Sequence, residues 1–152
     1  MANNNVIVTN RKALRDYFIL ETFEAGIELK GSEIKSIRKR RANIKEGFAR
    51  VEKGEVFLYN LHIDPYEFAR REEIDPIRAR KLLLKKKEIT YLSGKISEKG
   101  LTLVPLKLYL KRGLAKVEIA LVKGKKFYDK REALKRKESQ REMDRALRKK
   151  RG

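Results

Sequence analysis

The last thirty residues of this 152-residue chain are too polar to bury themselves, so any core has to come from the residues before them. Residues 123–152 read "KGKKFYDKREALKRKESQREMDRALRKKRG" and hold 14 basic and 5 acidic side chains. They are good helix formers, but a solitary helix of such charge is marginal in water. We therefore expect a compact body and a basic tail that is disordered in isolation and coils into a helix on a polyanion.

The net charge indicates the kind of partner. The chain carries 40 basic and 21 acidic side chains, a net charge of +19, which no packed core needs. Nucleic acid is the first candidate partner and an anionic membrane surface the second. The membrane is the weaker one, because the apolar runs are far shorter than the ~20 residues of a spanning helix and the start lacks a signal-peptide pattern. We expect a cytoplasmic protein with no membrane partner; without cysteine it has no disulfide or zinc–thiolate site.

The first half of the body has the pattern of short strands. Residues 17–30 predict two short strands or one bent strand, because an Ala-Gly pair interrupts a β-rich run. Ser32 is a candidate N-cap for a short helix in "SEIKSIRKR". Residues 44–51 and 55–63 predict two further strands, joined by a turn at a Lys-Gly pair.

The second half predicts one helix and one hairpin. An Asp-Pro pair is a favourable helix start, and apolar spacings of 7, 3 and 4 predict a helix over residues 77–97. Residues 101–110 and 116–122 predict a hairpin, in which Pro105 indicates an edge or a bulge. Short strands with inserted helices predict a small α+β domain whose sheet closes into a barrel.

No catalytic arrangement stands out. His62 is the only histidine, which favours a structural or surface role over a metal or catalytic one. "KGKK" lacks the spacing of a phosphate-binding loop. Glu72, Glu73 and Asp75 lie in an Arg-rich stretch, where local charge balance explains them better than a divalent-metal site. We expect no enzyme, no metal and no cofactor, and keep a nucleic-acid-processing enzyme that uses these three carboxylates as an alternative.

Cations alternate with aromatic rings where the tail begins. Ammonium and guanidinium groups neutralise phosphate, and exposed rings stack on unpaired bases. The stretch "KKFYDKR", residues 125–131, has both, although Phe127 is equally suited to pinning the chain to the body, and Tyr128 less so. Arg38 and its basic neighbours in "IRKRRANIKE" either contact RNA or complement a helix dipole.

Three blocks of the sequence resemble a known family. They read "FEAGIELKGSEIKSIRKRRANIKEGFA", "RARKLLLKKKEI" and "GLTLVPLKLYLKRGLAKVEIALVKGKKFYDKR". In this order they are similar to the signature blocks of the SsrA-binding protein family, also called small protein B, and the resemblance covers roughly residues 6 to 150. It implies a mainly β fold with helices: an oligonucleotide-binding (OB-like) closed β-barrel with flanking helices over residues 1–128, followed by a disordered basic tail over residues 129–152.

The resemblance also implies a function. A protein of this family is an adaptor and not an enzyme; it binds the tRNA-like domain of transfer-messenger RNA and brings it to stalled ribosomes for trans-translation, which tags incomplete nascent chains. Small-subunit ribosomal RNA is a further partner, elongation factor Tu and alanyl-tRNA synthetase are indirect ones, and the protein is a monomer off the ribosome. A ribosomal protein, or a general binder of structured RNA with a basic extension, is the alternative.

Three residues of the body match RNA contacts of the family. They are Glu24 in "FEAG", Leu83 in "RKLLL" and Lys116 in "AKVEI". A lysine suits a phosphate, and a carboxylate suits base amines or 2′-hydroxyls as an acceptor. Two alternatives stay open: Glu24 instead orients a nearby cation, and Leu83 instead belongs to the core.

The tail motif "GKK-x-x-DKR" of the family matches residues 124–131. The resemblance implies that the tail occupies the vacant mRNA channel and the decoding centre, in place of codon–anticodon pairing. Tyr128 stands where many members carry His, so a stacking ring is kept and a charged imidazole is lost. The further RNA contacts we expect are Arg38, Lys123, Lys125 and Lys126, and the decoding-centre residues we expect are Tyr128, Asp129, Lys130 and Arg131.

Overall fold

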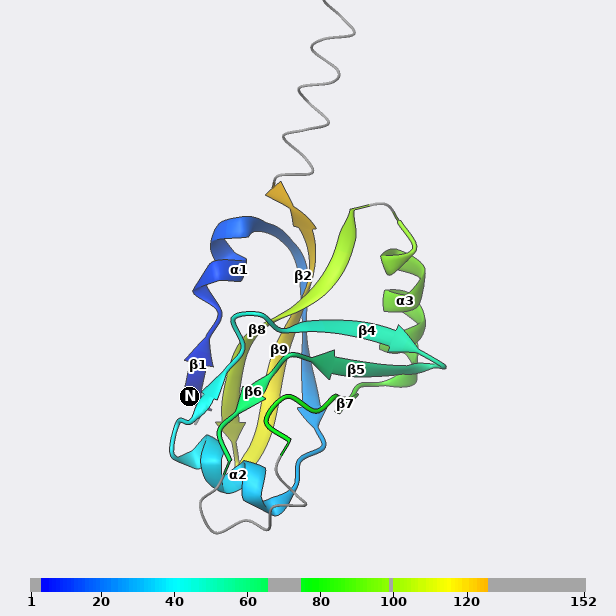
Figure 1. Ribbon diagram of the computed structural model, residues 1–152. Coiled ribbons are helices and arrows are strands. Elements are labelled where there is room, and N and C mark those ends of the chain that lie inside the picture. The colour runs from blue at the N-terminus through cyan, green and yellow to red at the C-terminus, as the bar shows by residue number, and fades with distance from the viewer. Residues whose placement is uncertain (1–3, 66–74, 99, 126–152) are drawn as a thin grey trace, which may run out of the picture.

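The computed structural model describes residues 4–65, 75–98 and 100–125 (Figure 1). The tail expected at residues 129–152 lies outside this part of the chain. The described residues are mainly β with a few helices, as the sequence predicts. In chain order the elements are β1 (Asn4–Thr9), α1 (Arg11–Asp16), β2 (Tyr17–Ile27), α2 (Gly31–Arg38), β3 (Ala42–Asn43), β4 (Phe48–Glu52), β5 (Glu55–Tyr59), β6 (His62–Ile63), β7 (Arg80–Leu83), α3 (Lys86–Ile96), β8 (Leu101–Lys111) and β9 (Leu114–Gly124).

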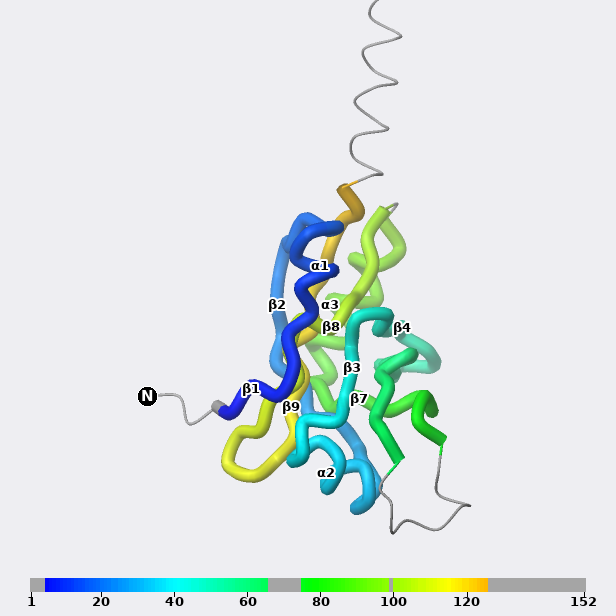
Figure 2. The backbone as a smooth tube through the Cα atoms, turned by 60° about the vertical axis from the view of Figure 1, so that its left-hand side comes forward, coloured from blue at the N-terminus to red at the C-terminus, as the bar shows by residue number. Residues whose placement is uncertain are grey.

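The larger sheet is antiparallel, with strand order β1-β8-β4-β5-β7-β2-β9. β8 also pairs with β9, so the pairings lead from β8 through β4, β5, β7, β2 and β9 back to β8. We call these six strands the ring. β1 lies outside the ring and pairs with residues 107–111 of β8, while β3 and β6 form a separate two-stranded sheet. Figures 1 and 2 show the strands wrapping around one core, with α2 at one end and α3 along one side.

The main core lies inside the ring, because side chains alternate between the two faces of each strand. On β9, Val117, Ile119 and Leu121 are at most 2% exposed and belong to this core. Lys116 and Glu118, which alternate with them, point to the outside and are half-buried. Near the start of β9, its outer face is therefore where charged side chains meet solvent.

Both expected hairpin turns are confirmed. β4 and β5 are joined at residues 53–54, and β8 and β9 at residues 112–113, with positive φ angles of 51° and 76° in the first turn and 52° and 78° in the second. Two successive positive φ angles define the type I′ turn, whose twist matches that of paired strands and whose second position favours Gly. The irregularity expected at Pro105 is confirmed as a bulge, because the register to β9 shifts between Pro105 and Lys107.

The other expected strands form with altered bounds. Of the two alternatives for residues 17–30, one strand is confirmed and two strands are wrong: β2 is a single strand that ends at Ile27, and its pairing with β9 has one irregularity. The strand expected at 44–51 begins only at Phe48, because residues 44–47 form a tight turn. The strand expected at 55–63 is split into β5 and β6 by Asn60, which has a φ of 58°.

The helix expected over residues 77–97 is wrong in its first half. Residues 80–83 form β7, in which Arg80 and Leu82 point inward, and α3 begins only at Lys86. Leu82 pairs with β5 on one side and β2 on the other, so it fills the core at a place where a helix would open the ring. Tertiary pairing overrides the helical spacing here.

The N-cap expected at Ser32 is also wrong. α2 begins at Gly31, and its N-cap is Lys30. The carboxylate of Glu33 accepts the backbone N–H of Lys30 at 2.8 Å and so satisfies a donor at the start of the helix. Glu88 has the same role at the start of α3, at 3.0 Å.

The sequence does not predict β1 or α1. α1 covers the outer face of β8 and β9 beyond the main core, where Ala13 packs with Val104, Leu106, Ala120 and Val122 in a second, smaller cluster. Among the described residues, no helix has both the length and the apolar content to span a membrane.

Candidate functional site

Four neighbouring strands bring a group of residues together on the outside of the ring. Leu83 on β7 is paired with Gly26 on β2. Gly26 is paired in turn with Lys116 on β9, whose other partner is Tyr109 on β8. Glu24 lies two residues before Gly26 on β2 and therefore on the same face. We call Glu24, Leu83, Lys116 and Tyr109 the outer patch.

Leu83 is the apolar member of the outer patch. Its side chain is 49% exposed, whereas that of Leu82 points inward and is 1% exposed. Gly26 makes room for it, since a Cβ at this glycine would lie only 3.2 Å from Leu83 Cβ. The core alternative for Leu83 is therefore wrong, and its side chain is available to a partner.

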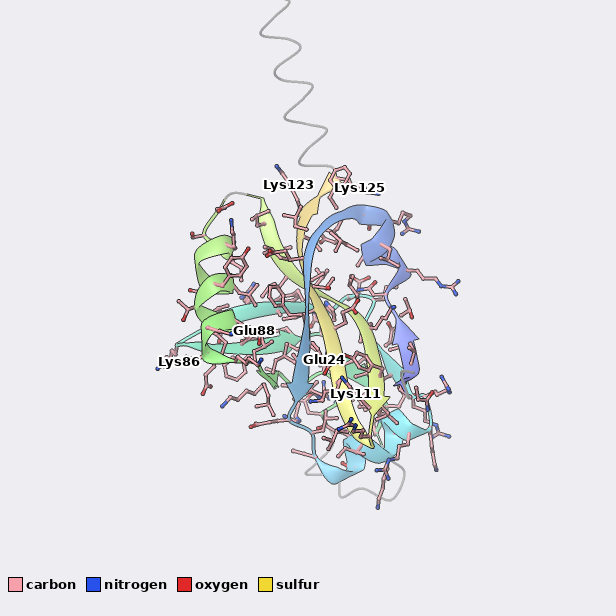
Figure 3. The ribbon with its side chains drawn as sticks, turned by 180° about the vertical axis from the view of Figure 1, so that it is seen from behind. Glu24, Lys86, Glu88, Lys111, Lys123 and Lys125 are labelled. Carbon is pink, nitrogen blue, oxygen red and sulfur yellow. The ribbon has the colours of Figure 1, made fainter. Side chains whose placement is uncertain are left out.

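Glu24 is held in place from β8. The Tyr109 hydroxyl donates to Oε2 of Glu24 at 2.5 Å, and the Lys111 ammonium lies 3.3 Å from each carboxylate oxygen. Figure 3 shows Glu24 and Lys111 side by side on this face. The Glu24 side chain is still 41% exposed, so its oxygens keep acceptor capacity for a partner. Both readings of Glu24 thus apply: it orients a cation, and it is an accessible acceptor.

The electrostatics keep this carboxylate ionised. The hydrogen bond from Tyr109 lowers the pKa of Glu24 below its ordinary value; partial burial opposes this, and Lys111 and Lys116 reinforce it. Conversely, burial and the hydrogen bond to Glu24 raise the pKa of Tyr109, so the phenol stays protonated and keeps donating. The pair is a fixed acceptor held by a fixed donor.

Lys116 is the cation at the centre of the outer patch. It lies between β2 and β8, and no carboxylate among the described residues forms an ion pair with it within 4 Å. Its charge is therefore less compensated than that of Lys111, which is paired with Glu24. This arrangement suits a phosphate contact.

Sequence reasoning missed Tyr109 and Lys111. A signal for them exists in "LKLYLK", where Lys107, Tyr109 and Lys111 alternate with leucines. That alternation places the three polar side chains on one face of β8. It does not reveal that the face adjoins Glu24, because the two strands are 85 residues apart at the hydrogen bond from Tyr109.

The other expected contacts do not join the outer patch. Lys123 and Lys125 lie at the opposite end of β9 (Figure 3), where Lys125 Nζ is 5.4 Å from the centroid of the Phe18 ring. Lys123 is seven positions after Lys116 on the same strand, which corresponds to about 23 Å. Arg38 is exposed at the C-terminal end of α2. The remaining expected residues, Lys126, Tyr128, Asp129, Lys130 and Arg131, lie outside the described part of the chain.

A second carboxylate is held inside the protein. Glu33 on α2 accepts hydrogen bonds from Arg78 Nη2 at 2.5 Å and from Arg80 Nε at 2.7 Å. Arg80 is fully buried and also donates to the carbonyl oxygens of Leu61 and Pro76, at 2.6 and 3.2 Å. Burial raises the pKa of Glu33, but its hydrogen-bond donors outweigh burial and bring the pKa below its ordinary value of 4.5. This cluster ties α2 to β7.

The residues weighed for catalysis form no site in the described part of the chain. There, no group of three His, Cys, Asp or Glu side chains is arranged to hold a metal ion. Glu72 and Glu73 lie outside the described residues. His62 is 47% exposed at its side chain, and its Nδ1 lies 3.2 Å from the carboxylate of Asp64, which fits a surface role.

The fold and the outer patch define a class of protein: a small, basic, mainly β domain that exposes charged and apolar side chains on one face of its sheet. The chain matches the family described as SmpB protein over residues 7–149. It therefore belongs to the SmpB family, and the resemblance of the three sequence blocks is confirmed.

Individual proteins show the same relationship. The SsrA-binding protein of Geobacillus thermodenitrificans is 62% identical over 143 residues, which cover 94% of this chain and 92% of that protein. The SsrA-binding protein of Geobacter sulfurreducens is 59% identical over 145 residues, 95% of each chain. A solved structure described as "tmRNA-SmpB: a journey to the center of the bacterial ribosome" is 54% identical, has a TM-score of 0.66, and covers 79% of this chain and 84% of that chain.

Proposed function

We propose that this chain is an RNA-binding adaptor for trans-translation: it binds the tRNA-like domain of transfer-messenger RNA and brings that RNA to stalled ribosomes. Membership of the SmpB family supports this, as do relatives that carry the name SsrA-binding protein. The neighbouring solved structure, whose description joins tmRNA, SmpB and the bacterial ribosome, supports the ribosomal part. Such an adaptor carries out no chemical reaction and works in the cytoplasm.

The outer patch is the observation that carries the proposal. Three residues that are far apart in the sequence lie on three different strands and share one exposed face: Glu24, Leu83 and Lys116. Lys116 contacts a phosphate, Glu24 accepts a hydrogen bond from a base amine or a 2′-hydroxyl, and Leu83 packs against a base or sugar. Phosphate, acceptor and apolar contacts in one patch suit a folded RNA better than a generic polyanion.

The rest of the fold supports the patch in this proposal. The ring is the OB-like closed barrel, and α2 and α3 are its flanking helices. Arg38 adds a phosphate contact at the end of α2, and Lys123 and Lys125 add contacts at the far end of β9, followed along the chain by Lys126. The body then comprises residues 1–128.

The tail at residues 129–152 reaches the ribosome in this proposal. It is disordered in isolation, and it becomes ordered in the decoding centre and the vacant mRNA channel, where Tyr128, Asp129, Lys130 and Arg131 contact small-subunit RNA. The adaptor is a monomer off the ribosome, and elongation factor Tu and alanyl-tRNA synthetase act on the same RNA complex.

A gel-shift competition tests the RNA partner. The full-length protein is titrated into the labelled tRNA-like domain of transfer-messenger RNA in the presence of an ordinary tRNA of equal length and therefore equal charge. We expect retention of the first at protein concentrations at which the second stays free. Equal affinity for both would contradict the proposal and favour a general binder of structured RNA, such as a ribosomal protein with a basic extension.

A further inference from the structure

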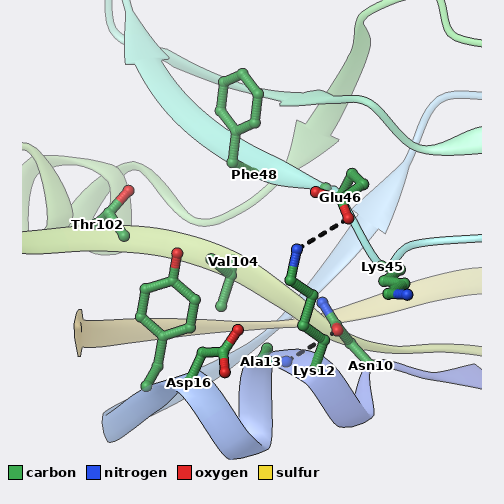
Figure 4. Close-up of a pocket in the computed structure, with 11 residues that line it drawn as sticks. Asn10, Lys12, Ala13, Asp16, Lys45, Glu46, Phe48, Thr102 and Val104 are labelled. Atoms are coloured by element: carbon green, nitrogen blue, oxygen red, sulfur yellow. Dashed lines mark hydrogen bonds and ion pairs between the residues drawn. The ribbon is translucent and has the colours of Figure 1, made fainter. Parts of the chain in front are cut away.

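A cleft of about 350 Å³ lies between α1 and the start of β4, at the end of β8 remote from the outer patch (Figure 4). Lys12 and Asp16 line it from α1, while Lys45 and Phe48 line it from the opposite side. β8 forms the floor between them. A volume of this size falls within the ~300–1,000 Å³ of typical sites for small ligands.

The cleft is preformed because one buried amide holds both walls and the floor. Asn10 is 3% exposed, and its side-chain oxygen accepts a hydrogen bond from the Ala13 N–H of α1 at 3.0 Å. Its Nδ2 donates to the carbonyl of Ile44 in the opposite wall at 3.2 Å, and to that of Pro105 in β8 at 2.9 Å. Each wall is therefore fixed relative to the floor, and the cleft needs no folding step before it takes a ligand.

Close packing sets the depth of the cleft on the β4 side. Gly47 lies so close to β8 that a Cβ would be 2.7 Å from Pro105 Cγ and 3.1 Å from the Ile44 carbonyl oxygen. Only glycine brings the turn this near to the bulge in β8. This turn, formed by residues 44–47, places Lys45 and Phe48 at the edge of the cleft.

The lining combines three kinds of group. Phe48 and Tyr17, which is the C-cap of α1, give each wall an aromatic ring. Asp16 and Thr102 supply a carboxylate and a hydroxyl. Lys45 supplies a cation that forms no ion pair with any other described residue. Aromatic surface, hydrogen-bonding groups and a free cation are together the chemistry that recognises a base and its phosphate.

We infer that this cleft binds a single unpaired nucleotide of the partner RNA, separately from the outer patch. The base packs against Phe48 and Tyr17, Asp16 accepts a hydrogen bond from an exocyclic or ring N–H of the base, and Lys45 binds the phosphate. The inference rests on the proposed RNA-binding function and adds a second contact to it. The net charge of +19 favours such an anionic occupant over a neutral ligand.

An ion pair at the mouth gives the inference a distinctive consequence. Lys12 Nζ lies 2.9 Å from Glu46, so its charge is already compensated, and Glu46 repels an incoming phosphate (Figure 4). Glu46→Gln removes that repulsion and frees Lys12. We expect this variant to bind the RNA a few-fold more tightly at low salt and the gain to fade as salt rises. A structural role of the ion pair alone predicts no gain.

Chemical footprinting of the complex of full-length protein and transfer-messenger RNA tests the site. We expect the wild-type protein to protect several unpaired nucleotides, and Phe48→Leu to lose protection at one of them, with about tenfold weaker binding. Asp16→Asn, which keeps the shape of the wall, loses protection at the same nucleotide and thus serves if Phe48→Leu does not fold. The matched control is Tyr59→Leu: Tyr59 stacks on Phe48, with ring centroids 5.4 Å apart, but does not line the cleft.

The outcomes separate the site from the proposed function. Footprints of Phe48→Leu and Asp16→Asn that match the wild type overturn the nucleotide site while leaving RNA binding intact. The same loss in Tyr59→Leu as in Phe48→Leu also overturns it, because the aromatic pair then acts through the fold. Unchanged or weaker binding by Glu46→Gln overturns the placement of the phosphate. If the wild-type protein does not select this RNA at all, the proposed function fails instead.

Discussion

Two glutamates of this protein, Glu33 and Glu24, have similar partners and opposite surroundings. Each accepts hydrogen bonds from a side-chain donor and faces a cation, and each has a lowered pKa. The Glu33 side chain is 8% exposed and the Glu24 side chain 41%. Burial separates the two: the Glu33 carboxylate joins parts of the protein, while the Glu24 carboxylate remains accessible from outside.

The partners show the same contrast. Arg80 beside Glu33 spends its donors on carbonyl oxygens and a carboxylate inside the protein. Lys116 beside Glu24 has no carboxylate within ion-pair distance among the described residues and lies on the outer face. The donors of Arg80 are all used inside the protein, so none is left for a ligand. The charge of Lys116 is not used in this way and remains available on the surface.

The largest effect is expected from breaking the internal pair. Glu33→Ala leaves the buried guanidinium of Arg80 without its counter-charge, which costs about 3–5 kcal/mol of the free energy of unfolding. Urea denaturation followed by circular dichroism measures it. Glu24→Ala is the matched control and changes stability by less than about 0.5 kcal/mol. Equal destabilisation by the two variants would contradict the distinction between the two sites.

The stability of the wild-type protein also depends on pH through Glu33. Because its pKa is lower in the folded protein, the ionised carboxylate stabilises the fold fully above its ordinary value of 4.5, and this contribution is lost as the pH falls through the lowered value. A series of denaturation curves below pH 5 therefore shows a decline in stability. We expect a shallower decline in Glu33→Ala; an identical pH profile would remove Glu33 as its source.

The next effect concerns RNA. Glu24→Ala removes the acceptor of the outer patch and weakens binding to transfer-messenger RNA by about 2 kcal/mol, or roughly 30-fold, with the melting temperature unchanged. A filter-binding titration together with a thermal melt checks both parts. A drop in melting temperature without a loss of affinity would assign Glu24 to the fold.

A smaller effect is expected for the central cation. Lys116→Ala loses about 1.5 kcal/mol of binding free energy, and the slope of log affinity against log salt becomes shallower by about 0.9. Binding measured at four salt concentrations gives the slope. Lys87→Ala, which removes the same charge from the exposed face of α3, is the control and keeps the wild-type slope. An unchanged slope in Lys116→Ala would exclude a phosphate contact.

The smallest effect sharpens the role of the donor. Tyr109→Phe removes only the hydroxyl that holds Glu24, and costs about 0.5–1 kcal/mol of RNA affinity. It also lets the pKa of Glu24 rise, so binding is lost at a higher pH than in the wild type when the solution is acidified. Affinity measured from pH 7 to pH 4 reveals the shift. Coincident pH profiles would show that Tyr109 does not tune this carboxylate.

The sequence predicts those parts of the fold that local chemistry decides. Two Gly-containing pairs define the hairpin turns, and Pro105 marks the bulge, because both depend on the backbone of a few adjacent residues. The helix prediction for residues 77–97 is wrong at β7 because Leu82 pairs with β5 and β2, which are distant in sequence. Local spacing carries no information about such partners.

The candidate site divides in the same way. Glu24, Leu83 and Lys116 come from matching blocks of the family, and the structure shows that they share a face. What positions these residues cannot be predicted from the sequence. Tyr109, whose hydroxyl donates to Glu24, is 85 residues away along the chain. The register of β7 decides whether Leu83 or its neighbour faces the core. The sequence points to these three candidate residues, and only the strand pairing identifies what positions them.

The strand β9 has a mechanical consequence. It is paired with β2 along one edge and with β8 along the other for most of its length. It carries Lys116 of the outer patch near its start, and Lys125 lies just beyond its end. A force that pulls Gly124 away from Lys116 acts parallel to the strand. The hydrogen bonds to β2 and β8 are perpendicular to the strand, so they resist this force in shear, all at the same time rather than one after another. Such an element transmits a pull from one end of the molecule to the other without stretching.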